Sequence, residues 1–282
     1  MLEALVSPHG PYSLALSVRT MGDATRRFRD GVLDARLSVG DSIERAQAWQ
    51  ARDGRLVLRA ESKEGLEQLG FVLAIEDDHS EFLLRFRGDP LLRQTLRVVR
   101  GLRPMRTATV AHALLRALCE QLIETRVARG IERRVICAAT DELDGLHAPP
   151  RGDDLARFSA AKLRALGLHA RRGATLLRLC RSLDLERLRD LPTEAVARRL
   201  EQERGLGPWS AGVVCLEGLG RYERGLVGDL GLIKLVSALH GRWAEAWETA
   251  ELLEPYGEWQ GLASVYLMAG YGRGLVPLPA AA

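Results

Sequence analysis

Long apolar segments and clustered cysteines are missing from this chain of 282 residues. No run of about 18 uncharged apolar residues occurs, which excludes a membrane-spanning helix. The first ten residues lack a basic stretch followed by an apolar core, so we expect no secretory signal and a cytoplasmic protein. The cysteines lie far apart, which excludes zinc and iron–sulfur spacings and predicts free, buried thiols. They are Cys119, Cys137, Cys180 and Cys215.

Lysine is also scarce. Of the 40 basic residues, only Lys63, Lys162 and Lys234 are lysines, and the rest are arginines. Either a genome rich in arginine codons or a need to bind phosphate accounts for this bias, because the planar guanidinium fork suits phosphate. The net charge of +3 is too small to predict a polyanionic partner. Composition therefore leaves the partner open.

The chain between residues 10 and 76 mostly alternates polar and apolar residues, which predicts a small antiparallel sheet. Turn-forming pairs separate the alternating segments, and Asp53-Gly54 is the strongest hairpin signal among them. The expected strands are Tyr12–Val18, Val32–Val39, Ile43–Ala51, Arg55–Ala60 and Gly70–Glu76.

From Asp78 onward, apolar residues recur at spacings of three and four, which is typical of helices. Asp78 or Ser80 can cap a short helix, Asp89 starts another, and Thr107 can cap a long apolar segment. Further helices are expected at Asp153–Ala165, Ala170–Leu183, Thr193–Arg204, Pro208–Leu219, Leu230–Leu239, Trp243–Leu253 and Trp259–Ala269. The sequence thus predicts an α+β fold, with a β domain at residues 1–88 and a helical body of two lobes at 89–282.

A glycine turn, Gly205-Leu206-Gly207-Pro208, joins two of the expected helices. Two glycines permit a tight turn, and a proline at the first helical position leaves no donor unused. Free amides at the start of the second helix, together with its dipole, form a phosphate site that reads no base sequence. The alternative is a plain helix–helix turn.

Asp229 stands 22 residues after Gly207, at the start of an apolar helix. Aspartate there is an ordinary N-cap. The helix dipole also keeps such a carboxylate ionised, and an ionised carboxylate can stabilise a cation that develops in a transition state. An aromatic-rich turn, Glu254–Ala263, then leads into the last helix and is either part of a site or a boundary with core aromatics.

In this order, the glycine hairpin, the aspartate and the aromatic turn resemble the helix-hairpin-helix superfamily of DNA glycosylases. The resemblance covers about residues 80–270 and includes Arg100–Pro104, Glu120–Leu122 and Leu166–Leu168. Within the superfamily, the chain looks most like the bacterial 3-methyladenine DNA glycosylase II group. Those proteins carry an N-terminal β-sheet domain resembling half of a TATA-binding protein, which agrees with the sheet expected at residues 10–76.

The resemblance assigns roles to single positions. Asp229 matches the catalytic aspartate. Leu122 falls where an apolar wedge enters the gap that the flipped nucleotide leaves in the duplex. The residues expected to contact DNA are Gln121, Leu122, Gly205, Gly207 and Ser210.

Two further groups follow from the same resemblance. The main-chain carbonyls of Glu201, Glu203 and Leu206 fall where relatives bind a sodium or potassium ion. The base pocket is expected to involve Trp209, Val213 and Met268, and Trp209 either stacks on the base or fills the gap between helices.

The resemblance implies a monofunctional glycosylase that removes alkylated purines from double-stranded DNA in base excision repair. Glycosylase/lyases use a lysine two residues after the second hairpin glycine, where this chain has Trp209. Iron–sulfur branches of the superfamily carry four clustered C-terminal cysteines, and no cysteine here follows Cys215. We therefore expect a nucleoid-associated monomer without an iron–sulfur cluster, a required cofactor or lyase activity, and with no membrane partner.

Three positions depart from the pattern of the relatives. Val213 replaces a tyrosine of some relatives, Met268 replaces an aromatic residue, and Gln260 replaces an arginine. These departures leave the lesion open. A glycosylase for deaminated or oxidised bases is one alternative, and a non-catalytic damage-binding protein, in which Asp229 is only a helix cap, is another.

Overall fold

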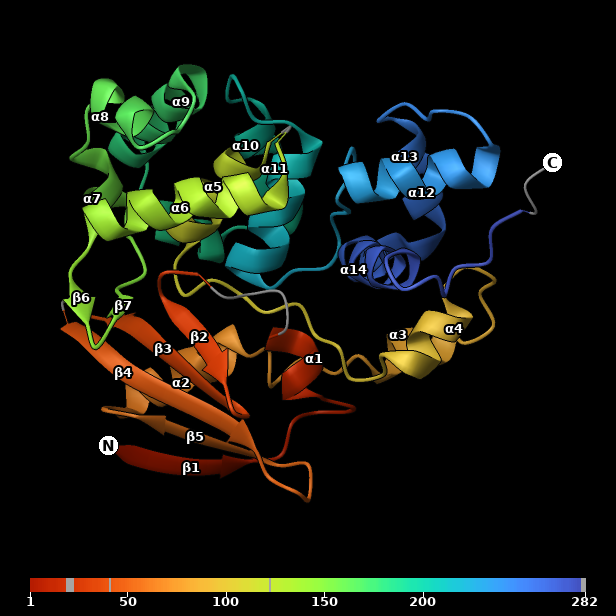
Figure 1. Cartoon of the computed structure of the whole chain (residues 1–282), viewed down its shortest axis with the longest axis horizontal. Helices are drawn as coiled ribbons and strands as arrows, with labels where there is room; N and C mark the ends of the chain where they lie inside the picture. Colours follow the sequence, from red (N-terminus) through yellow and green to blue (C-terminus); the bar gives the residue numbers. More distant parts are fainter. Residues whose placement is uncertain (19–22, 41, 122, 280–282) are drawn as a thin grey trace.

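The computed structural model describes residues 1–18, 23–40, 42–121 and 123–279. An antiparallel five-stranded sheet near the N-terminus lies beside a larger helical body (Figure 1). The predicted α+β fold is therefore confirmed. Within these residue ranges, no helix is both long and apolar enough to cross a membrane.

The sheet has the strand order β1-β5-β4-β3-β2. Three of its expected strands, at 32–39, 43–51 and 55–60, form nearly as predicted, and Asp53-Gly54 makes the expected hairpin turn. Gly54 has a φ of 89°, and the amide of Ala51 donates to the carbonyl of Arg55 at 2.8 Å. The two edge strands, β1 and β2, were not predicted from the sequence. The strands are β1 (Leu2–Val6), β2 (Arg26–Arg29), β3 (Val32–Val39), β4 (Ser42–Gln50) and β5 (Leu56–Ala60).

Two expected strands are helical instead. Tyr12–Val18 contains helix α1 (Leu14–Val18), and Gly70–Glu76 contains the end of helix α2 (Lys63–Val72). In α1 the buried residues are Leu14, Ser17 and Val18, which is the spacing of a helix face, whereas an alternating strand would place Leu14, Leu16 and Val18 on one face. Both helices contribute to one apolar core with the sheet, so the sheet is covered by helices rather than extended by strands.

The helical body follows the sheet domain and has its own buried core. Among the described residues, the buried members of this core lie between Phe82 and Val276, with Ala24 as the one addition from the sheet domain. The boundary at residue 88 stays a prediction. Its helices are α3 (Ser80–Arg85), α4 (Arg93–Val98), α5 (Val110–Glu120), α6 (Thr125–Ala139), α7 (Gly152–Ala156), α8 (Ala160–Ala165), α9 (Ala170–Ser182), α10 (Thr193–Glu201), α11 (Pro208–Val213), α12 (Leu230–His240), α13 (Glu248–Leu253) and α14 (Gln260–Tyr271). A π-helical segment, Val214–Leu219, continues α11.

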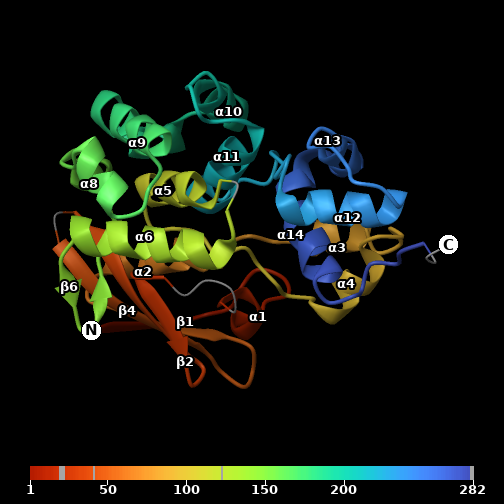
Figure 2. The same ribbon diagram turned by 45° about the horizontal axis from the view of Figure 1, so that its top comes forward.

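Helices from distant parts of the chain share one side of this body. Figure 1 shows α3 and α4 beneath α14, apart from α5 to α11, and Figure 2 keeps the same grouping. Aromatic rings join them, because Phe82 of α3 lies 5.4 Å from Tyr266 of α14 between ring centroids. The chain therefore crosses between the two groups of helices twice, after α4 and again before α12.

Several helical predictions need correction. The segment 153–165 forms two helices, α7 and α8, and α13 begins at Glu248 rather than at Trp243. Thr109, not Thr107, caps α5, because its hydroxyl accepts from the amide of His112 at 3.2 Å. Helix α6 was not predicted. Cys137, on α6, is exposed, whereas the other three cysteines are buried as expected.

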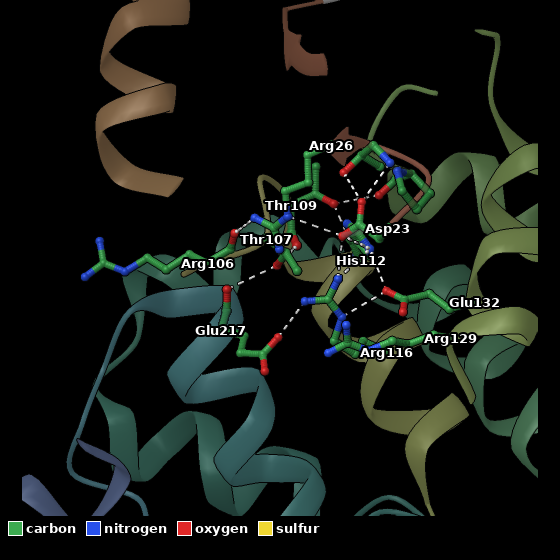
Figure 3. A network of polar contacts seen from close by, with 12 residues as sticks. Asp23, Arg26, Arg106, Thr107, Thr109, His112, Arg116, Arg129, Glu132 and Glu217 are labelled. Carbon is green, nitrogen blue, oxygen red and sulfur yellow. Dashed lines mark hydrogen bonds and ion pairs between the residues drawn. The ribbon is translucent and has the colours of Figure 1, made fainter. Parts of the chain in front are cut away.

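Arg116 of α5 lies at the centre of a buried polar network (Figure 3). Its guanidinium donates to Asp23 at 2.6 Å, to Glu132 of α6 at 2.9 Å and to Glu217 of the π-helical segment at 2.8 Å. Burial opposes ionisation of Asp23, but the positive charges of Arg26, His112 and Arg116 outweigh burial and hold the pKa of that carboxyl well below its ordinary value. The sheet domain and three segments of the helical body therefore meet around one charge.

We expect Arg116→Met to destabilise the protein by about 3–5 kcal/mol, because removing one partner leaves buried carboxylates uncompensated. At Asp23 and Glu132 burial opposes ionisation, but Arg116 and its neighbours outweigh burial and lower the pKa of both carboxyls. This stabilisation is present above the unfolded pKa values and is lost as pH falls, so urea unfolding should show a larger loss at about pH 6 than at about pH 3. Arg133→Met, on the exposed face of α6, is the control and should stay within about 0.5 kcal/mol of wild type. Equal losses in both variants would contradict this role of Arg116.

Candidate DNA-binding and catalytic site

The two hairpin glycines between α10 and α11, Gly205 and Gly207, differ in backbone conformation and in the space around them. Gly205 has a φ of +98°, and a Cβ there would lie 2.9 Å from Oγ1 of Thr175. Gly207 has a φ of −132°, and a Cβ there would meet nothing within 4 Å. Gly205 is therefore required by the fold of the turn, whereas Gly207 leaves the outer surface of the turn bare.

The start of α11 presents unused amides. Pro208 has no N–H, and the amides of Gly207, Trp209 and Ser210 donate to no residue in the described part of the chain. The positive end of the helix dipole lies at the same place. The hairpin thus has the donors and the charge for an anion such as a backbone phosphate.

Gln121, the C-cap of α5, ties this hairpin to the rest of the body. Its side-chain amide donates to the carbonyl of Gly205 at 2.9 Å and to the hydroxyl of Ser210 at 2.9 Å. Ser210 is buried. Gln121 and Ser210, which were predicted to contact DNA, therefore hold the hairpin in place in this structure. Leu122, the predicted wedge, lies outside the described residues.

Asp229 caps α12, as its position predicted. Its Oδ1 accepts from the amide of Gly231 at 2.7 Å, and its Oδ2 accepts from the indole N–H of Trp209 at 2.9 Å. The second contact joins the candidate catalytic carboxylate to the hairpin helix. The spacing of residues 209 and 229 gave no signal for this contact, because it depends on how α11 and α12 pack.

The three residues expected in the base pocket, Trp209, Val213 and Met268, differ in their distance from Asp229 and in their burial. Met268 of α14 lies at the first turn of α12, since a Cβ at Gly231 would be 3.2 Å from its sulfur and 3.0 Å from Oδ1 of Asp229. Trp209 is half-buried, packs against the core and binds Asp229. Val213 is only 3% exposed and belongs to the core. Two of the three therefore lie at Asp229, and Val213 offers little surface to a base.

The aromatic turn before α14 is a helix boundary with core aromatics. Tyr256 is buried, with its ring 5.1 Å from that of Phe86, and Trp259 lies 5.8 Å from Phe82. The turn thus fixes α14 against α3 and contributes to the site only indirectly.

Comparison with known proteins agrees with this geometry. No protein-family model matches the chain. A DNA-3-methyladenine glycosylase of Bacillus subtilis is 24% identical over 204 residues, which cover 68% of this chain and 67% of the relative. The solved 3-methyladenine DNA glycosylase of Archaeoglobus fulgidus has a TM-score of 0.84 at 18% identity, covering 97% of this chain and 99% of that chain. The chain shares the fold of the helix-hairpin-helix DNA glycosylases and is similar in sequence to one of them.

The fold is shared with enzymes of other specificity. A DNA-bound 8-oxoguanine glycosylase/lyase of Clostridium acetobutylicum has a TM-score of 0.79 at 16% identity, covering 97% of this chain and 99% of that chain. Fold similarity therefore does not identify a lesion for this protein.

Hydrogen bonding distinguishes the three main-chain carbonyls that are expected to bind a cation, those of Glu201, Glu203 and Leu206. The carbonyl of Glu203 accepts from the amide of Leu206 at 3.0 Å, and the carbonyls of Glu201 and Leu206 accept no hydrogen bond among the described residues. The carboxylates of Glu201 and Glu203 are paired with arginines and are not needed as ligands. Two of the three main-chain oxygens, those of Glu201 and Leu206, therefore have no hydrogen-bond donor among the described residues.

A second cluster of possible ligands lies elsewhere in the glycosylase. Asp23, His112 and Glu132 have ligand atoms within 4.8 Å of one another. Arg116 already donates to both carboxylates, so its guanidinium supplies the positive charge there. We therefore assign this cluster to folding and not to a metal.

Gly207→Val should weaken duplex DNA binding about tenfold to 100-fold, because its side chain would keep phosphate away from the hairpin amides. Thermal unfolding should be unchanged, because the free protein has room for the side chain and the backbone is already extended there. Fluorescence anisotropy at two salt concentrations measures the affinity. Gly205→Ala is the contrasting variant and should lower the thermal midpoint. Wild-type affinity in Gly207→Val would contradict docking through the hairpin.

Proposed function

We propose that this protein is a monofunctional DNA glycosylase that releases alkylated purines from double-stranded DNA in base excision repair. Asp229 carries the proposal. Its carboxylate lies at the N-terminus of α12, accepts from the Trp209 indole and the Gly231 amide, and is joined through Trp209 to a hairpin with free amides. The similarity to 3-methyladenine glycosylases supports the choice of substrate class.

The reaction needs only a carboxylate, water and bound DNA. The bond between C1′ of the deoxyribose and the purine nitrogen breaks, and its electron pair leaves with the base. The sugar becomes an oxocarbenium-like cation, which the fixed negative charge of Asp229 stabilises. Water adds to C1′ and loses a proton, which leaves a hydroxyl on an abasic site. Trp209 and Gly231 hold the carboxylate in position throughout.

Cationic bases suit this site better than neutral ones. N3-methyladenine and N7-methylguanine carry a positive charge, so each leaves as a neutral base without prior protonation. Met268, beside the first turn of α12, is flexible and apolar and offers no aromatic face for selecting a base. The charge and weakened bond of the lesion would then contribute more to the rate than pocket recognition.

Positioning on DNA falls to the hairpin. The amides of Gly207, Trp209 and Ser210 would bind one backbone phosphate, and Leu122 would act as the wedge during nucleotide flipping. A sodium or potassium ion on the carbonyls of Glu201, Glu203 and Leu206 would fix the turn beside that phosphate. We propose that the protein acts as a monomer on chromosomal DNA.

Lyase chemistry would need an amine where this chain has Trp209. Borohydride added to a reaction with abasic or methylated duplex should therefore trap no covalent protein–DNA adduct. An adduct would show that one of the three lysines reaches C1′ and that the protein is a glycosylase/lyase.

Single-turnover excision from duplexes that each carry one lesion tests the proposed substrate. N3-methyladenine and N7-methylguanine should be released faster than hypoxanthine or 8-oxoguanine. Faster release of 8-oxoguanine would assign the protein to oxidised bases instead. Tight binding without release of any base would leave a damage-binding protein.

Asp229→Asn should lower base release at least about 100-fold, because it removes the charge that stabilises the sugar cation. Folding and DNA binding should stay close to wild type, since asparagine caps helices well. Excision and anisotropy on the same preparation separate the two effects. Near wild-type excision by a folded Asp229→Asn protein would show that Asp229 is only a cap.

Trp209→Phe should lower excision about tenfold to 100-fold, because the carboxylate loses one charge-assisted hydrogen bond that orients it. Duplex affinity should change little, since phenylalanine keeps the packing against the core. A fall in excision without a fall in affinity identifies Trp209 as a positioning residue. Parallel loss of both would instead indicate that the indole contacts DNA.

A further inference from the structure

Two tryptophans on the connection between α12 and α13 are unusually exposed. Trp243 is 64% exposed and Trp247 is 60% exposed, whereas the remaining three tryptophans are half-buried. Tryptophan is highly buried on average, because its large ring is costly to hydrate. Two such rings on one short connection therefore point to a binding surface.

The connection that carries them is well ordered by polar contacts. Glu248 is buried and accepts from Arg242 at 2.7 Å and from the amide of Glu245 at 2.7 Å. The hydrogen bond from Arg242 holds the pKa of Glu248 at about 2, so the pair is charged at neutral pH. The amide of Ala244 also donates to Ser237 of α12 at 2.9 Å. The rings are thus displayed on a fixed connection, which lowers the entropy lost on binding.

The same connection returns to the candidate active site. The amide of Gly228 donates to Thr249 at 2.7 Å, and a Cβ at Gly228 would lie 3.6 Å from that of Ala246. Ala246 therefore lies close to Gly228, which precedes Asp229 in the chain, and Trp247 is the next residue after Ala246. In Figures 1 and 2 the connection runs above α12, on the same side of the molecule as α10 and α11.

We infer that Trp243 and Trp247 form a second DNA-contact surface and stack on bases left unpaired or unstacked around the flipped nucleotide. The inference rests on the proposed function, because the connection that carries both rings approaches Gly228, the neighbour of Asp229, through Ala246. Base stacking on aromatic rings tolerates any sequence, so it suits unpaired bases around a lesion in any sequence context. Two rigid rings also suit bases better than phosphates, which need donors.

Intrinsic fluorescence and anisotropy test the inference with a short labelled duplex that contains a tetrahydrofuran abasic-site analogue. Binding should quench tryptophan emission in wild type. Trp243→Phe/Trp247→Phe should lose most of the quenching and keep much of the affinity, because phenylalanine still stacks. Trp243→Ala/Trp247→Ala should bind about fivefold to 100-fold more weakly for each stacked ring. The loss should be smaller on an intact duplex, whose bases stay paired.

Leu84→Ala/Val98→Ala is the matched control, since these residues of α3 and α4 are 62% and 57% exposed and lie away from the hairpin. It should bind like wild type. Unchanged affinity and quenching in the tryptophan variants would overturn the inference. Equal losses on intact and abasic duplexes would overturn base stacking in favour of backbone contact. Wild-type self-association that the alanine variant abolishes, seen by sedimentation, would show that a second copy covers the rings.

The two proposals fail in different ways. If wild type binds the abasic duplex with quenching but releases no base from methylated DNA, the proposed activity fails and the tryptophan surface stands. If wild type excises bases and the alanine variant binds and excises equally well, only the surface fails. If wild type binds no duplex, both are overturned.

Discussion

The buried guanidinium of Arg116 joins the sheet domain to the helical body. A buried charge must be paired on all sides, because its desolvation is too costly otherwise. Asp23, Glu132 and Glu217 supply that pairing from the sheet domain, from α6 and from the π-helical segment after α11. The relative positions of these segments are therefore restricted by hydrogen-bond distances as well as by apolar packing.

Helix α5 extends this constraint to the site. Arg116 and Gln121 belong to the same helix and its C-cap, and Gln121 binds the hairpin through Gly205 and Ser210. One residue before Ser210, Trp209 binds Asp229 at the start of α12. A continuous series of contacts thus runs from the buried network to the carboxylate. A rigid carboxylate matters for a glycosylase, because preorganised charge needs no rearrangement when the sugar cation forms.

Local patterns predicted the fold where one periodicity was unambiguous. Val32–Val39 alternates over eight residues and is β3, and Asp53-Gly54 forms the hairpin turn between β4 and β5. The seven residues 12–18 fit both periods, and their buried positions are those of helix α1. Helix α6 was missed although the sequence carries a signal for it. Its buried residues include Ala128, Ile131 and Val135, which recur at the helical spacing of three and four.

The sequence by itself determined the order and chemistry of the hairpin glycines, Asp229 and the residue at position 209, because turns and caps depend on residues close in the chain. The tertiary structure alone decided that Trp209 donates to Asp229, that Gln121 holds the hairpin, and that Val213 is buried. It also decided that Trp243 and Trp247 stay exposed on the connection between α12 and α13. These properties depend on the packing of helices distant in sequence, and spacing along one chain does not encode which side chains then meet.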